Sequence, residues 1–184
     1  MIISCHQPNL LPWTPYFEKI QRSDLFVILE NVQFTRHQFQ NRFEYQGKWQ
    51  TMPVERGHLK DLIKDKKYLE PILSWNRVKR SVAKPQLSHF DELIGENLSR
   101  TNTLIIDRVC QMMKINTPMI KDTKSDQADS SQKLLEICLK HGATTYLSGP
   151  SGRNYLNEEI FTLNGIKISY FEPKNKEHIL DRIG

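Results

Sequence analysis

The sequence lacks the long apolar run that a membrane helix requires. No stretch of about 18 consecutive apolar residues occurs, so we expect no membrane span. The first residues also lack a basic segment followed by an apolar one, so we expect no secretory signal. Cysteine is scarce, with three residues far apart and no C-x-x-C pair. We therefore expect reduced thiols in a cytoplasmic protein.

Motifs of several enzyme classes are absent as well. The sequence contains neither a phosphate-binding G-x-x-x-x-G-K-[ST] loop nor a dinucleotide-binding G-x-G-x-x-G. It has no G-x-S-x-G elbow on which a serine hydrolase triad could be built. The six histidines lack ligand spacing, and no carboxylate pair stands out. We therefore predict no metal site.

The chain carries an excess of positive charge, +5 at pH 7. Such a balance suits any polyanionic partner. Much of the excess lies at 60–67 and 77–84, where acidic and apolar residues are interspersed. That mixture is typical of a solvated helix face. Because zinc-finger spacing and aromatic RNA-binding signatures are absent, binding to nucleic acid is the minority hypothesis.

The hydropathy pattern predicts a single α/β domain over residues 1–184, with a mainly parallel sheet. Residues 1–5 have the character of a strand, as does the apolar run at 25–29. A short helix at 16–20, opened by a Thr-Pro pair, joins them into a βαβ unit. Because the second run is apolar throughout, we expect it to be buried on both faces of the sheet.

The remaining pattern predicts a helical insertion followed by the end of the sheet. A hairpin is expected with its turn at Gln46-Gly47. Further helices and strands are expected in this order: a weak helix at 70–84, helices at 89–98, 104–113 and 131–141, and strands at 144–147 and 166–171.

Polar side chains cluster where the first two predicted strands end. They are His6, Gln7, Asn9 and Trp13 after the first strand, and Glu30 and Gln33 after the second. Ligands of parallel sheets bind outside the carboxyl ends of the strands. Such amide-rich sites bind sugar hydroxyls, phosphates or carboxamides. A purely structural role for a histidine before a proline-rich turn is the alternative.

Arginines nearby are candidate contacts for an anionic ligand. Arg36 and Arg42 flank a histidine, and a guanidinium fork suits carboxylate or phosphate. We predict that His6, Asn9, Gln33 and Arg42 line one cavity.

A loop of small residues, SGPSGRNYL, follows the strand predicted at 144–147. Small residues let backbone N–H groups approach a phosphate. The candidate contacts in it are Ser151, Arg153 and Asn154. A plain turn is the alternative.

The stretch HQPNLLPWTPYFEKIQRSDLFVILENVQF resembles the opening signature of the WbqC-like family of bacterial proteins. The matches include the HQPN start, the Ser-Asp pair, the VQF triplet and the Asn41-Arg42 pair. The later YLSGPSGRNYLNEEIFTLNGIKISYFE resembles the family's second block. The resemblance spans nearly the whole chain. Glu30 stands where the family has Asp, and the ending from 171 onward lacks the family's His-Pro and aromatic-Gln residues.

This resemblance implies an enzyme of surface-polysaccharide biosynthesis that helps to make the O-antigen of lipopolysaccharide. The implied reaction transfers an acyl or aminoacyl group to an amino sugar linked to a nucleotide. His6 is then the general base for the attacking amine, while Gln7, Asn9 and Gln33 orient the substrate. A non-catalytic protein that binds nucleotide sugars or glycans is the alternative.

The same stretches carry a second, fainter likeness. VQF and SGRNYL are similar to parts of pantothenate synthetases, which adenylate an acid before forming an amide. That likeness implies ATP as a co-substrate, with Ser151, Arg153 and Asn154 at its phosphates. The co-substrate therefore stays open between ATP, which would activate a free acid, and a ready-made acyl donor.

Overall fold

The computed structural model describes residues 1–58, 60–124, 129–174 and 176–183. The chain forms two compact units, each assembled from three stretches. Unit 1 comprises Met1–His6, Pro15–Leu29 and Asn116–Asn175, and unit 2 comprises Gln7–Thr14, Glu30–Ile115 and Lys176–Gly184. The division into two compact units does not test the prediction of a single domain over residues 1–184, which stays a prediction.

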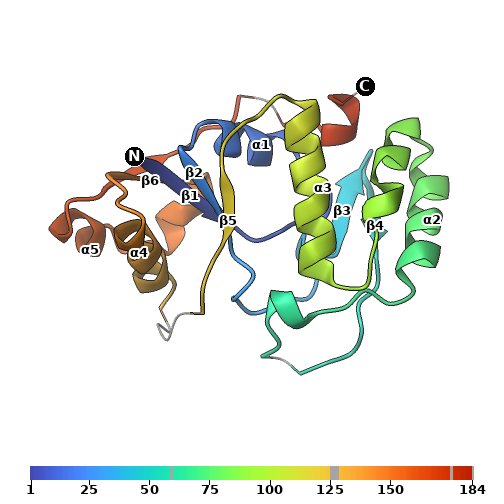
Figure 1. The fold of residues 1–184 in the computed structure, drawn as a ribbon, viewed down its shortest axis with the longest axis horizontal. Coiled ribbons are helices and arrows are strands. Elements are labelled where there is room, and N and C mark those ends of the chain that lie inside the picture. Colours follow the sequence, from blue (N-terminus) through green and yellow to red (C-terminus); the bar gives the residue numbers. More distant parts are fainter. Residues whose placement is uncertain (59, 125–128, 175, 184) are drawn as a thin grey trace. The chain divides into compact units, whose positions relative to one another are not determined.

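Unit 1 is built on a five-stranded sheet with the strand order β5-β2-β1-β6-β7 (Figure 1). The strands are β1 (Ile2–His6), β2 (Leu25–Ile28), β5 (Met119–Lys121), β6 (Thr145–Ser148) and β7 (Lys167–Tyr170). All neighbouring strands run parallel. The predicted α/β class, with a mainly parallel sheet and a βαβ start, is confirmed.

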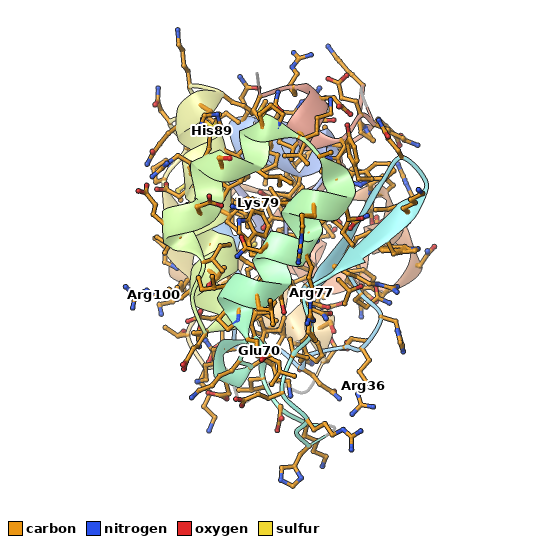
Figure 2. The ribbon with its side chains drawn as sticks, turned by 90° about the vertical axis from the view of Figure 1, so that its right-hand side faces the viewer. Arg36, Glu70, Arg77, Lys79, His89 and Arg100 are labelled. Carbon is orange, nitrogen blue, oxygen red and sulfur yellow. The ribbon has the colours of Figure 1, made fainter. Side chains whose placement is uncertain are left out.

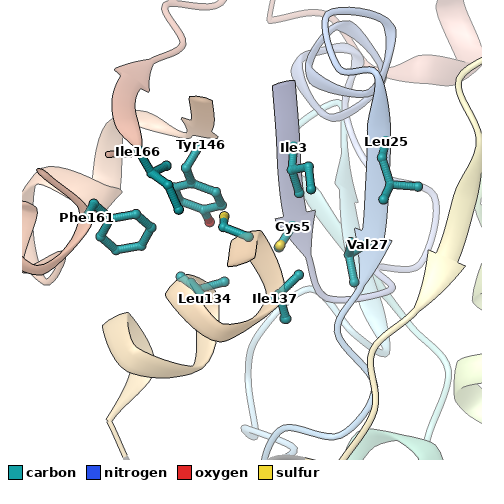
Figure 3. Packing of buried hydrophobic residues seen from close by; sticks show 10 residues of the cluster. Ile3, Cys5, Leu25, Val27, Leu134, Ile137, Tyr146, Phe161 and Ile166 are labelled. Carbon is teal, nitrogen blue, oxygen red and sulfur yellow. The ribbon is translucent and has the colours of Figure 1, made fainter. Parts of the chain in front are cut away.

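Helices cover both faces of this sheet. They are α1 (Thr14–Gln21) on one face, and α4 (Ser130–Lys140) with α5 (Glu158–Leu163) on the other (Figure 1). Successive side chains of a strand point to opposite faces. Thus Ile3 and Val27 pack with Ile137 of α4 in one buried cluster (Figure 3), whereas Phe26 meets the ring of Tyr16 in α1 at 5.4 Å. This double cover explains the apolar run of β2.

Unit 2 holds the predicted helical insertion and a two-stranded hairpin. Its elements are β3 (Arg42–Tyr45), β4 (Lys48–Thr51), α2 (Pro71–Val82) and α3 (Leu98–Met112), with short 3-10 helices η1 (Ile63–Asp65), η2 (Pro85–Leu93) and η4 (Ile179–Asp181). The hairpin and the helix near 70–84 are confirmed.

The α-helix predicted at 89–98 is wrong. Its first half, 89–93, is the end of the 3-10 helix η2, residues 94–97 are not helical, and α3 begins six residues earlier than predicted, at Leu98. The side chain of Asn97 starts α3 by accepting a hydrogen bond from the backbone N–H of Arg100 at 2.8 Å. Asp91 accepts hydrogen bonds from Trp75 and Lys79 of α2, which ties η2 to that helix instead.

Candidate functional site

The β3–β4 hairpin of unit 2 has one buried face and one exposed, polar face. Residues directly opposite in an antiparallel pair share a face. Arg42 stands opposite Thr51, and Glu44 stands opposite Trp49. These four side chains therefore lie on the exposed face, because Phe43, Tyr45 and Gln50, which alternate with them along the strands, are buried.

The predicted turn fixes this register. Gln46 and Gly47 have φ angles of 49° and 74°. Positive φ at both central residues defines the type I′ turn, whose twist matches that of the two strands. The Gln-Gly pair therefore decides that Arg42 and Trp49 share the exposed face.

A cavity of about 810 Å³ opens beside Arg42 and Thr51. Its lining residues are Gln33, Phe34, Thr35, Arg36, His37, Asn41, Arg42, Thr51, Val54, Glu55, Arg56, Gly57, His58 and Lys66. We call this cavity the basic pocket, because its walls carry three arginines, a lysine and two histidines against one carboxylate.

Backbone pairing brings the walls of the basic pocket together. The N–H of Phe34 donates to the carbonyl of Asp61 at 2.9 Å, which joins the segment after β2 to the stretch before η1. The N–H of Glu55 donates to the carbonyl of Lys67 at 2.9 Å. Segments far apart in sequence are thus held side by side by main-chain bonds.

Lys66 organises one wall of the pocket. This side chain is 8% exposed, and its Nζ donates to Asp61 Oδ2 at 3.0 Å and to the carbonyl of Glu55 at 3.3 Å. The hydrogen bond from Lys66 holds the pKa of Asp61 below its usual range. A side chain at Gly57 would collide with the Asp61 carboxylate, so glycine lets the loop pack there. Because Asp61 compensates Lys66, the arginines supply the free positive charge.

Arg42 is held in place by contacts that leave part of it available. Its guanidinium carbon lies 4.0 Å from the centre of the Trp49 ring, a cation–π contact. One terminal nitrogen donates to the carbonyl of His37, a residue in the left-handed region with φ 61°. Its Nε is buried, and within the described parts of the chain it has no hydrogen-bond partner. A ligand atom in the pocket would instead accept from the other terminal nitrogen, which forms no hydrogen bond within the described chain and is not among the buried atoms.

Arg36 and Arg56 add uncompensated charge. Both are exposed, and neither forms an ion pair with any carboxylate among residues 1–58, 60–124, 129–174 and 176–183. Figure 2 shows the guanidinium of Arg36 pointing outward, well apart from Arg77 and Arg100. Cations on the walls of a concave surface focus the field on anions. The pocket can therefore bind phosphate or carboxylate groups.

The sequence model of the WbqC-like protein family matches residues 7–178. The chain belongs to this family. An uncharacterised protein of Mycobacterium tuberculosis, Rv1507c, is 28% identical over 186 residues, which cover 90% of this chain and 80% of that protein. No solved structure matches the chain significantly.

The WbqC-like signature contributes directly to the basic pocket. The VQF triplet supplies Gln33 and Phe34, and the Asn-Arg pair supplies Asn41 and Arg42. Asn41 also fixes the hairpin, because its side chain donates to the carbonyl of Met52 at 2.9 Å. Two separate parts of the signature thus meet at one cavity.

The structure distributes the predicted site residues of this WbqC-like chain over both units. Gln33, Arg36 and Arg42 line the basic pocket. Elsewhere in unit 2, Gln7, Asn9, Trp13 and Glu30 are not lining residues of the pocket. His6, Ser151, Arg153 and Asn154 belong to unit 1. A single cavity for His6, Asn9, Gln33 and Arg42 stays a prediction.

Two of the four predicted residues of unit 2 outside the pocket, Gln7 and Glu30, have side-chain partners in the fold. Gln7 Oε1 accepts from the side chain of Gln40 at 2.5 Å, and Glu30 accepts from the hydroxyl of Ser99 at 2.6 Å. Asn9 is buried. The indole N–H of Trp13 is buried too and has no partner among the residues that the structure describes.

The predicted residues of unit 1 lie at the carboxyl edge of the parallel sheet. β1 ends at His6, and its neighbour β6 leads into the short 3-10 helix η3 (Pro150–Asn154). The His6 ring meets the Tyr16 ring edge-on at 4.8 Å. Arg153 lies 4.1 Å from the centre of the Tyr170 ring. Substrate binding at this edge stays a prediction.

The sequence predictions did not include several charged residues that line the basic pocket or are buried. Arg56, His58 and Lys66 belong to no motif, and the solvated helix face predicted at 60–67 is wrong for the buried Lys66. In unit 1, Lys19 is buried and donates to the carbonyl of Cys5 at 2.9 Å. Burial lowers the pKa of Lys19 to about 8. The one signal that could have indicated Lys19 is its place inside the stretch that resembles the family signature.

Two further properties bear on the kind of site. Among the described residues, no three His, Cys, Asp or Glu side chains gather in a way that could hold a metal ion. No helix in the described parts of the chain is both long and apolar enough to cross a membrane.

Proposed function

We propose that this protein is a transferase of surface-polysaccharide biosynthesis that acylates an amino sugar linked to a nucleotide, and that its basic pocket holds the diphosphate. The observation that carries the proposal is the unbalanced charge of the pocket, in which Arg36 and Arg56 have no carboxylate partner in the described chain. The family signature, which supplies part of this pocket, supports it.

Charge-assisted hydrogen bonds make such a pocket effective for phosphate. A guanidinium forms two parallel bonds to one phosphate group, and each hydrogen bond to a charged group contributes about 1.5–3 kcal/mol. Arg42 is already oriented by Trp49 and His37. Little side-chain entropy is therefore lost when it binds a ligand.

The proposed step joins the amine nitrogen of the sugar to the acyl carbon of a donor, either a thioester or an adenylate made from ATP. The bond between that carbon and the donor's sulfur or phosphate oxygen breaks, and the amine proton passes to a base. His6 is the predicted base. His37 and His58 in the pocket wall offer two further imidazoles.

Binding of anions tests the pocket. Titration calorimetry with nucleotide-linked amino sugars, nucleoside diphosphates and pyrophosphate should detect saturable binding. Arg42→Met should weaken this binding by about 1.5–3 kcal/mol, the range for hydrogen bonds to a charged group. Arg100→Ala is the matched control, because it removes an exposed arginine of the same unit that does not line the pocket. Absence of binding by every phosphate compound would contradict the proposal.

Turnover separates an enzyme from a binding protein. Mass spectrometry should detect a nucleotide amino sugar that has gained an acyl group when the protein, the sugar and a thioester are mixed, or when ATP and a free acid replace the thioester. His6→Ala should abolish the product and leave pyrophosphate binding intact. Tight binding without product over the whole donor panel would favour the non-catalytic alternative.

A further inference from the structure

We infer that Phe39 and Trp49 form a stacking platform for the base of a nucleotide whose phosphates lie in the basic pocket. The inference rests on the proposed function and adds to it the place of the base. Its starting point is a pair of aromatic rings that the core does not use. Phe39 is 43% exposed and Trp49 is 45% exposed.

The two rings form one unit. Their centroids are 5.6 Å apart, and the ring planes are inclined by 44°. Both rings are held on fixed backbone: Trp49 belongs to β4, and the carbonyl of Phe39 accepts from the N–H of Leu10 at 2.9 Å. Exposed aromatics of this kind are the surfaces on which bases of nucleotides stack.

Arg42 connects the platform to the basic pocket. This residue lines the pocket, while its guanidinium lies against the Trp49 ring at 4.0 Å. The hairpin register places Arg42 and Trp49 on the same exposed face. In a nucleotide only the ribose separates the base from the first phosphate. A ligand whose phosphate accepts from Arg42 can therefore place its base on Trp49.

The charges around the platform favour a base over a second anion. Glu44 stands directly opposite Trp49 on the exposed face. Its carboxylate repels phosphate, whereas it can accept a hydrogen bond from an N–H group of a base. The exposed face of the hairpin thus matches the two ends of a nucleotide. Near Thr51 it is positively charged and suits the phosphates, and near Trp49 it offers aromatic rings and one hydrogen-bond acceptor for the base.

Two measurements test the platform. Affinities are measured by calorimetry for UDP, dTDP, CDP, ADP and GDP, with pyrophosphate and glucose 1-phosphate as probes without a base. The tryptophan fluorescence, to which Trp13, Trp49 and Trp75 contribute, is followed in parallel. We expect at least one nucleoside diphosphate to quench this fluorescence and pyrophosphate to leave it unchanged, with the quenching lost in Trp49→Phe.

Phe39→Ala is the decisive variant, because the described contacts of this ring include Trp49 and not Arg42. It should weaken the tightest nucleoside diphosphate by about tenfold, as expected for loss of one stacking contact, and change pyrophosphate binding by less than about twofold. Leu163→Ala, which removes an exposed apolar side chain in unit 1, is the control and should change neither.

The outcomes separate this inference from the proposed function. If pyrophosphate binds but Phe39→Ala leaves nucleoside diphosphates unaffected, the platform is refuted and the phosphate pocket stands. If glucose 1-phosphate is weakened as much as the nucleotide, the rings bind the sugar and the assignment to a base is wrong. If the parent binds none of the phosphate compounds, the proposed function fails and the platform with it.

Discussion

Acidification should destabilise unit 2 through His178. This imidazole is 7% exposed and packs between Phe43 and Tyr45 of β3, with ring centroids 5.2 Å away in each case. Its Nδ1 accepts a hydrogen bond from the N–H of Leu180 at 3.2 Å. A protonated imidazole carries a hydrogen on both nitrogens, so it could no longer accept this bond. The fold therefore favours the neutral ring.

The size of the effect follows from the pKa of His178. Burial lowers this pKa from 6.5 to about 4, although the nearby carboxylate of Asp181 opposes the change. Between these two values the unfolded chain binds a proton that the folded chain does not. The stabilisation is complete above pH 6.5 and is lost as the pH falls toward 4. Each pH unit removes up to about 1.4 kcal/mol, so the whole range removes about 3 kcal/mol.

Urea unfolding at pH 7 and pH 4.5, followed by tryptophan fluorescence, measures this loss. His178→Asn is the comparison variant, because an amide oxygen can still accept from Leu180 while the side chain no longer titrates. Asp61 and Asp91, whose pKa values are held low, also lose their stabilising effect in acid, but they do so in both proteins. The parent should lose about 2–3 kcal/mol more than the variant. Equal losses would refute the reasoning.

Three other predictions concern the core, the thiols and the loop after β6. Phe26 is fully buried, so Phe26→Ala should lower the free energy of unfolding by about 3–5 kcal/mol; a loss below about 1 kcal/mol would contradict its place in the core. The three cysteines are buried and free, and burial raises the pKa of Cys110 and Cys138 to about 12. A thiol-specific disulfide reagent at pH 8 should therefore react slowly with the folded protein and rapidly with the protein unfolded in urea. Rapid reaction of the folded protein would show that a thiol is accessible. Arg153→Ala should leave the melting temperature nearly unchanged and weaken binding of nucleotide sugars by about 1.5–3 kcal/mol; unchanged affinity would remove this loop from the site.

Local sequence patterns were sufficient to predict those elements whose structure depends on residues close together in the sequence. The apolar run that became β2 and the Gln46-Gly47 turn both indicated their structures directly. β5 was missed because it has only three residues, none of them buried, at the edge of the sheet. The first turn of α3 was missed because Ser99 and Thr101 are buried there, so polar residues interrupt the apolar period.

The basic pocket could be predicted only in part, for a physical reason. Arg42 belongs to the recognisable signature, and Arg36 comes two residues after its VQF triplet and flanks the same histidine, so their residue types and position indicated an anion site. Lys66 looked like part of a solvated charge run, and its burial depends on Asp61 and on the loop that passes Glu55. Such tertiary pairing leaves no periodic trace in the sequence.

The strand order of unit 1 also governs when the protein can fold during synthesis. β1 is made first, yet it occupies the centre of the sheet, and its neighbour β6 lies about 140 residues later in the chain. A ribosome must therefore release most of the polypeptide before the central strand gains its second partner. Until then one edge of β1 has unpaired backbone groups that can pair with another chain. Slow translation or truncation before Thr145 should therefore leave nascent chains that aggregate or bind chaperones. A chain that extends through β7 can instead complete the five-stranded sheet.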